Sequence, residues 1–363
     1  MNDAAADGAA GAGVDGVIKA SAHRLLQRWG AAGDAGPAAA RRGHDGDAGF
    51  DANAWAELQQ AGFALAMLDE EHGGVGVINA FVIARLAGQH AVSLPLAESM
   101  AANRLLSAAG IELPGGPVSL AQVPARLERV PGGWRLLGTA ARVPWGRCSG
   151  LVLAATDGAR RYLAHLPVGQ LSFKHGTNLA GEPRDDALID HAVGAAQVAP
   201  MPVGLGEDPV LAIGAALRTA QIAGAAQAAL ALTVGYARER KQFGRAIGSF
   251  QAVQQLLAVM ATQAAAARVA ADLAAHAAVD GLDACRIGIA KARASEAAGA
   301  IAATAHQVHG AIGFTRDYAL HPLTHRLWSW RDEFGADAQW AVAIGRRLAG
   351  AGGERLWQEL AAL

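Results

Sequence analysis

Hydrophobic positions follow a helical period towards both ends of the chain and form short separate runs in the middle. From residue 17 to 113, apolar side chains recur at helical spacing, with short breaks at glycine and proline. From residue 118 to 203, the apolar runs are short and bounded by Gly, Pro and Asp, which is typical of strands. From Asp208 onward, long Ala-rich helical segments return, and such small side chains let helices pack closely. The pattern predicts helices, then a small antiparallel β domain, then a helical bundle.

These changes of pattern predict an α+β fold that is mostly α, in four parts. The parts are a disordered N-terminus rich in Ala, Gly and Asp at 1–14, an N-terminal helical domain at 15–115, a central β domain at 116–205 and a C-terminal helical bundle at 206–363.

Composition excludes several classes of function. Lys and Arg total 31 against 32 Asp and Glu, so we expect no nucleic-acid partner. The two cysteines, Cys148 and Cys285, are far apart and have no Cys/His ligand spacing, which predicts no metal site and no disulfide. Gln, Arg, Asp and His interrupt the Ala-rich segments, so we expect no membrane span. With no secretion signal at the N-terminus, a cytoplasmic location is expected.

The segment from Tyr236 to Gln251 is the first candidate for binding chemistry. It combines Arg240, Phe243, a glycine break and Gln251 with further basic residues. The guanidinium fork of arginine suits a pyrophosphate, and an aromatic ring can pack against a purine or ribose. A solvated helix end with ordinary surface charges is the alternative interpretation of such a segment.

A second candidate follows a helix at Gln307, Val308, His309, Gly310 and Ala311, and continues to Thr315. Gly310 allows the backbone to turn closely past a ligand, and Gln307 and His309 offer an amide and an imidazole. A purely structural turn is the alternative.

Together these segments resemble the acyl-CoA dehydrogenase family over nearly the whole chain, as a divergent short member. The segments 55–76, 236–251 and 307–318 resemble three of its signatures and lie in the family's order. The resemblance implies a C-terminal four-helix bundle and FAD-dependent α,β-dehydrogenation of an acyl-CoA, with electrons passed to an electron-transfer flavoprotein. It also implies that Arg240, Phe243 and Gln251 hold the pyrophosphate and adenosine end of an FAD shared across a dimer interface. Residues 307–311 would contact the same cofactor.

The resemblance further implies an oligomer. The expected assembly is a homodimer, a homotetramer or a heterotetramer with a paralogous subunit.

The expected catalytic base departs from the family pattern. Typical members carry a glutamate directly before a glycine, whereas this chain has Phe334 before Gly335. Glu333 precedes Phe334 by one position and is the predicted base, with Asp332 as the alternative. A carboxylate acting as base needs a pKa suited to proton abstraction. The other interpretation is that these carboxylates are solvated loop charges or pair with Arg331 and Arg326, and Glu239 is interpreted as an ion-pairing surface group.

The central segment also departs from the family. Typical members have a Trp-Ile-Thr-like strand beside the flavin ring, and this chain reads Arg142-Val143-Pro144-Trp145 there. Trp145 is a candidate to cover the ring or, alternatively, a core tryptophan. Trp328 and Trp330, with small residues near Ala336, suggest a bulky, branched, aromatic or steroid-like acyl group.

Three hypotheses follow. The first is a complete acyl-CoA dehydrogenase. The second is a non-catalytic or half-site partner subunit of a heteromeric enzyme, favoured by the missing base and the altered strand. The third, ranked lowest, is a flavin monooxygenase or oxidase on the same scaffold.

Overall fold

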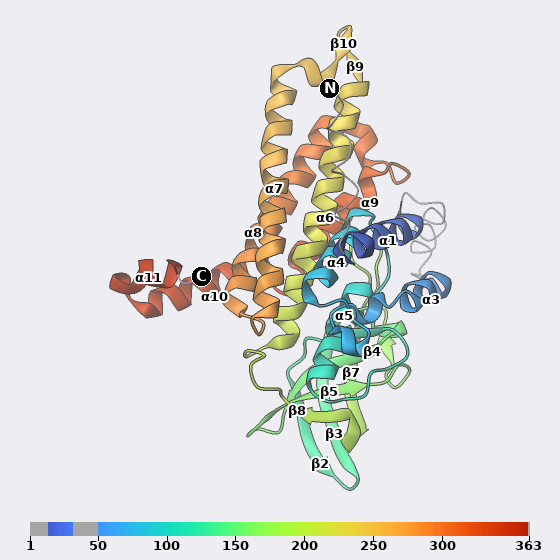
Figure 1. The fold of residues 1–363 in the computed structure, drawn as a ribbon, viewed down its shortest axis with the longest axis vertical. Coiled ribbons are helices and arrows are strands. Elements are labelled where there is room, and N and C mark those ends of the chain that lie inside the picture. Colours follow the sequence, from blue (N-terminus) through green and yellow to red (C-terminus); the bar gives the residue numbers. More distant parts are fainter. Residues whose placement is uncertain (1–13, 32–49, 362–363) are drawn as a thin grey trace, which may run out of the picture.

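The computed structural model describes residues 14–31 and 50–361, which form helices, a central sheet and further helices in that order (Figure 1). The predicted fold class is confirmed. The segment predicted to be disordered, 1–14, lies outside the described residues except for Val14, where the first helix begins.

The N-terminal helices are α1 (Val14–Trp29), α3 (Ala52–Gln60), α4 (Val77–Gln89) and α5 (Leu96–Ala108), with 3-10 turns η1 (Phe63–Leu65) and η2 (Glu70–His72). Among the N-terminal helices, α4 and α5 pack against the long helix α6, α5 also contacts the sheet, and α1 packs on α4 (Figure 1). The start of α3 is fixed by Asp51, whose carboxylate accepts hydrogen bonds from the backbone N–H groups of Asn53 and Ala54.

The central sheet has the strand order β6-β7-β3-β2-β4-β5-β8, with β1 beside β4. The strands are β1 (Val118–Leu120), β2 (Ala125–Val130), β3 (Gly133–Pro144), β4 (Gly150–Thr156), β5 (Arg161–Leu166), β6 (Phe173–Lys174), β7 (Arg184–Gly194) and β8 (Val198–Pro200). Most pairs are antiparallel, as expected, but β4 pairs in parallel with both β1 and β2, so the sheet is mixed. The long β3–β7 pairing is irregular between Ala140 and Val143.

The C-terminal helices are α6 (Pro209–Glu239), α7 (Gln251–Val279), α8 (Ala284–His309), α9 (Leu320–Asp332), α10 (Asp337–Ala351) and α11 (Leu356–Ala361). In the C-terminal part, α7, α8 and α9 pack around α6, which runs the length of the bundle, while α10 packs on α8 and α11 on α10 (Figure 1). A hairpin of β9 (Lys241–Gln242) and β10 (Arg245–Ala246) joins α6 to α7 at the end of the bundle farthest from the sheet (Figure 1).

By length and composition alone, α6 and α7 could cross a membrane, with mean hydropathies of 1.2 and 1.3. The most apolar window of α6 is 94% buried inside the protein, which is typical of a core helix. The corresponding window of α7 is only 28% buried. Its exposed side chains include Val259 and Val269, so α7 presents an uncovered apolar face. The absence of a membrane span stays a prediction.

Candidate functional site

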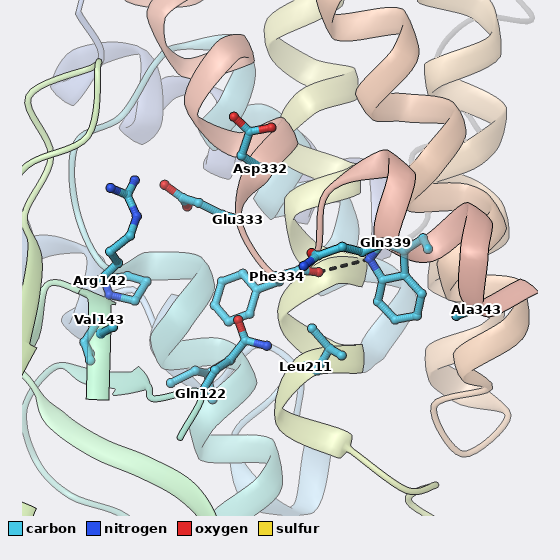
Figure 2. Close-up of a pocket in the computed structure, with 14 residues that line it drawn as sticks. Gln122, Arg142, Val143, Leu211, Asp332, Glu333, Phe334, Gln339 and Ala343 are labelled. Atoms are coloured by element: carbon cyan, nitrogen blue, oxygen red, sulfur yellow. Dashed lines mark hydrogen bonds between the residues drawn. The ribbon is translucent and has the colours of Figure 1, made fainter. Parts of the chain in front are cut away.

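A cavity of about 800 Å³ lies between the central sheet and the sheet-proximal end of the C-terminal helices (Figure 2). The sheet side is lined by Leu120, Gln122, Ala141, Arg142, Val143 and Pro144, and the helical side by Leu211, Asp332, Glu333, Phe334, Gly335, Gln339, Trp340 and Ala343. This volume and mixture of apolar and polar walls suit a small organic ligand. Both candidate bases, Glu333 and Asp332, therefore line one cavity.

The Glu333 carboxylate is fully engaged by protein donors. Arg184 donates to it from Nε at 2.7 Å and from Nη2 at 2.9 Å, and Arg218 donates from Nε at 2.8 Å. Asn178 Nδ2 adds a fourth hydrogen bond at 3.1 Å. The side chain of Glu333 is only 9% exposed. Buried carboxylates held in this way are ion-pair partners.

These contacts continue into a buried charge network. It alternates acids and arginines in the order Glu98, Arg218, Glu333, Arg184, Glu182 and Arg326. Three carboxylates and three guanidinium groups balance one another, which offsets the cost of removing the charges from water. Glu98 lies in α5, Arg218 in α6, Arg184 in β7 and Arg326 in α9, while Glu182 precedes β7 and Glu333 follows α9. The charge network thus joins the N-terminal helices, the central sheet and the C-terminal helices beside the cavity.

The charge network also sets the acidity of Glu333. Burial works to raise the pKa of its carboxyl, but the guanidinium groups of Arg184 and Arg218 outweigh burial and hold the pKa at about 2. A carboxylate with so low a pKa is a weak proton acceptor. The catalytic role of Glu333 stays a prediction, and this geometry weighs against it. Asp332 is 68% exposed at its side chain and lies 3.6 Å from Arg331 Nε.

The next two residues form a constrained turn at the cavity wall. Phe334 has a left-handed φ of +53° and Gly335 a φ of +89°. The Phe334 ring lies against Gly214 of α6, where an added Cβ would come within 2.2 Å of it. Trp340 Nε1 donates to the Phe334 carbonyl oxygen at 3.1 Å. An aromatic ring thus occupies the position where the family resemblance places the base.

Lys291 of α8 holds this turn from the protein interior. Its ammonium donates to the backbone carbonyl oxygens of Arg331 at 2.7 Å and Gly335 at 2.9 Å, and to Ser295 Oγ at 3.0 Å. The residue is 0% exposed. Burial lowers the pKa of Lys291 to about 7, although the nearby acids Glu333, Asp332 and Asp337 oppose this.

Replacing Lys291 with methionine is expected to change how stability depends on pH. The pKa of Lys291 is about 7 in the folded protein and takes its usual value of 10.5 in the unfolded chain. Between these two pH values the unfolded wild-type chain therefore binds more protons than the folded protein does. The free energy of unfolding of the wild type, relative to Lys291→Met, should therefore rise with pH in this window by up to about 1.4 kcal/mol per unit. Urea denaturation across this range measures it. Lys174→Met, at an exposed position of β6, is the control, and a Lys291→Met profile parallel to wild type would refute the expectation.

The first predicted cofactor segment lies at the opposite end of α6. Arg240 directly follows the helix, Phe243 is 92% exposed at the tip of the β9–β10 hairpin, and Gln251 begins α7 exposed to solvent. Phe243 adopts a left-handed φ of +52° and its ring contacts Phe250 edge to face at 6.1 Å. The Arg245 guanidinium lies 4.1 Å from the centre of the Phe250 ring.

The second predicted segment joins the first. The rings of Tyr236 and His309 stack at 4.4 Å, which brings the end of α8 beside the end of α6. Gln307, Gly310 and Ala311 are exposed there and Val308 is half-buried. His309 is 4% exposed, and its Nε2 has no hydrogen-bond partner within the described part of the chain.

We call Arg240, Phe243, Gln251 and residues 307–311 the hairpin surface. Its guanidinium, amide and aromatic groups, with the free His309 nitrogen, fit the phosphate and adenosine end of FAD. Leu211, at the cavity, lies in the first turn of α6 and Arg240 after its last, so at about 1.5 Å per residue the two are roughly 40 Å apart. The structure gathers the predicted cofactor residues but separates them from Glu333 and Asp332. Trp145, the candidate ring cover, is 3% exposed and is not among the residues that line the cavity.

Comparisons with known proteins agree with this architecture. A family model described as acyl-CoA dehydrogenase, C-terminal domain, matches residues 209–338. Acyl-CoA dehydrogenase IpdE2 of Mycobacterium tuberculosis is 33% identical over 293 residues, which is 79% of this chain and 84% of that protein. The caffeyl-CoA reductase-Etf complex subunit CarC of Acetobacterium woodii is 38% identical over 104 residues, covering 28% of this chain and 27% of CarC.

Solved structures share the fold of this chain. A chain of the ChsE4-ChsE5 complex from Mycobacterium tuberculosis superposes with a TM-score of 0.77 at 22% identity, covering 92% of this chain and 97% of that chain.

Proposed function

The chain belongs to the acyl-CoA dehydrogenase family, and from this premise we propose that it is one subunit of an oligomeric FAD-dependent enzyme that oxidises an acyl-CoA thioester. Members of this family are FAD-dependent flavoproteins. The observation that carries the proposal is the distance of roughly 40 Å along α6 between the hairpin surface and the cavity of the same chain. The hairpin surface is therefore proposed to bind the cofactor of a second chain.

The surface of α7 supports an oligomer. Its apolar face is uncovered in the single chain, and α7 begins directly after the β9–β10 hairpin. A second chain packed on α7 would bury that face and approach the exposed Phe243 ring. The structural likeness to a chain of the ChsE4-ChsE5 complex is consistent with either a second copy or a paralogous partner.

The carboxylates decide what this chain contributes to the reaction. Oxidation of an acyl-CoA requires removal of an α-proton by a base, while FAD, when bound, accepts the hydride. Glu333 is paired with two arginines and has a pKa of about 2, so we propose that it organises the cavity and that a paralogous partner chain, not a second copy, supplies the base for the acyl group bound there. The similarity to CarC, a subunit of an Etf complex, supports an electron-transfer flavoprotein as acceptor.

A second candidate is a complete homomeric enzyme with Asp332 as the base. Its carboxylate lines the cavity and is 68% exposed, so it is accessible to a bound acyl group. Asp332→Asn would then abolish oxidation in a homomer, whereas the partner-subunit proposal predicts activity only when a second, different chain is present.

Visible absorption spectroscopy tests the proposal. We expect flavin absorbance in the assembled protein, anaerobic bleaching by an acyl-CoA, and loss of flavin in Arg240→Gln but not in Arg126→Gln, which alters an exposed arginine of β2. An assembly without flavin would refute the proposal. Flavin that consumes oxygen without an acyl-CoA would instead indicate the monooxygenase or oxidase alternative.

A further inference from the structure

Arg142 has an unusual backbone conformation at the cavity wall. It lies on β3 with a left-handed φ of +53°, where the pairing of β3 with β7 is irregular. Its backbone N–H donates to Asp186 Oδ1 at 2.8 Å, which anchors the irregularity. A long side chain in this conformation is strained, and such irregularities redirect side chains. The Arg142 side chain is thereby directed along the cavity wall (Figure 2).

The Arg142 side chain is exposed to solvent and is available to a ligand that enters the cavity. Three charged side chains line it, namely Arg142, Asp332 and Glu333. Glu333 is neutralised by Arg184 and Arg218, and Asp332 lies 3.6 Å from Arg331. The Arg142 guanidinium has no ion pair or hydrogen bond with any other residue that the structure describes. In Figure 2 the Arg142 side chain rises on the sheet side of the cavity, and the Glu333 side chain extends towards it from the helical side.

We propose that Arg142 recognises a carboxylate on the acyl group bound in the cavity, so that the substrate is an acidic acyl-CoA. The guanidinium fork matches the two oxygens of a carboxylate. The apolar lining, including Val143, Leu211 and Phe334, would pack against the hydrocarbon part of the same acyl group. This inference rests on the proposed function and narrows its substrate class.

The test compares two acyl-CoA esters of equal chain length on the full-length protein in the assembly in which it purifies. Titration calorimetry with glutaryl-CoA and pentanoyl-CoA should show that wild type prefers the acidic ester by roughly 10- to 100-fold. Arg142→Gln should lose this preference and keep its affinity for pentanoyl-CoA. Arg142→Lys should retain part of the preference, and Arg126→Gln all of it.

Each other outcome has a distinct meaning. Equal binding of both esters by wild type, or an unchanged preference in Arg142→Gln, overturns the inference and leaves the proposed function standing. Equal weakening of both esters in Arg142→Gln with loss of flavin overturns it too, because Arg142 would then serve the cofactor. If wild type binds neither ester, the inference is overturned, whereas the proposed function is decided separately by flavin absorbance and its bleaching by an acyl-CoA.

Discussion

Glu333→Gln is expected to lower the free energy of unfolding by about 3–5 kcal/mol at neutral pH. Glutamine has nearly the same shape as glutamate but removes the negative charge between Arg184 and Arg218. Both arginines are only 2% exposed, so their positive charges would stay buried without the Glu333 counter-charge. Guanidinium chloride denaturation measures the loss. Because the pKa of Glu333 is lowered from 4.5 to about 2, its stabilisation is present above about pH 4.5 and disappears as the pH falls towards 2. The difference between wild type and Glu333→Gln should shrink across that window.

The neighbouring carboxylate provides a matched control. Asp332→Asn removes an exposed charge from the same turn and should change stability by less than about 0.5 kcal/mol. Unchanged stability of Glu333→Gln together with lost acyl-CoA oxidation would contradict the structural role and favour the predicted base.

Gly224→Ala is expected to destabilise the protein by about 1–3 kcal/mol or more. Gly224 of α6 lies where α4 crosses it, and an added Cβ would come within 1.8 Å of the Arg85 carbonyl oxygen. The contact is reciprocal, since a Cβ on Gly88 of α4 would lie 2.1 Å from the Gln221 carbonyl oxygen. Because both obstacles are backbone atoms, α4 and α6 must separate to admit even one methyl group.

The same helix contains the control. An added Cβ on Gly235 meets nothing within 4 Å, so Gly235→Ala should stabilise the protein by about 0.5–1 kcal/mol through helix propensity. Chemical denaturation of both variants measures the two effects. A neutral or stabilising effect of Gly224→Ala would show that the contact between α4 and α6 does not control stability.

The sequence predicted the features that depend on local pattern. The helical period, the short strands and the turn around Gly310 each arise within a few residues, so the fold class follows from them. The link between the segments of Tyr236 and His309 came from the family resemblance, and the stacking of these two rings is a tertiary contact. The position of Glu333 at the cavity was likewise accessible from the motif.

The environment of Glu333 could not be predicted in the same way. Its partners Arg184 and Arg218 are 149 and 115 positions away in sequence, and Arg218 reaches a further 120 positions to Glu98. Because the pKa of Glu333 is set by these distant arginines, its motif position says little about its role. The sequence did contain one indication of the charge network. Arg218 is a charged residue inside a long apolar helix, and a buried charge needs a partner of opposite charge.

Native mass spectrometry of the purified protein tests the central proposal, a cofactor shared between chains, most directly. We predict that FAD is found only on assemblies of two or more chains, and that Arg240→Gln removes it from those assemblies. A monomer of this chain that retains one FAD, or an Arg240→Gln assembly with full flavin content, would contradict the account.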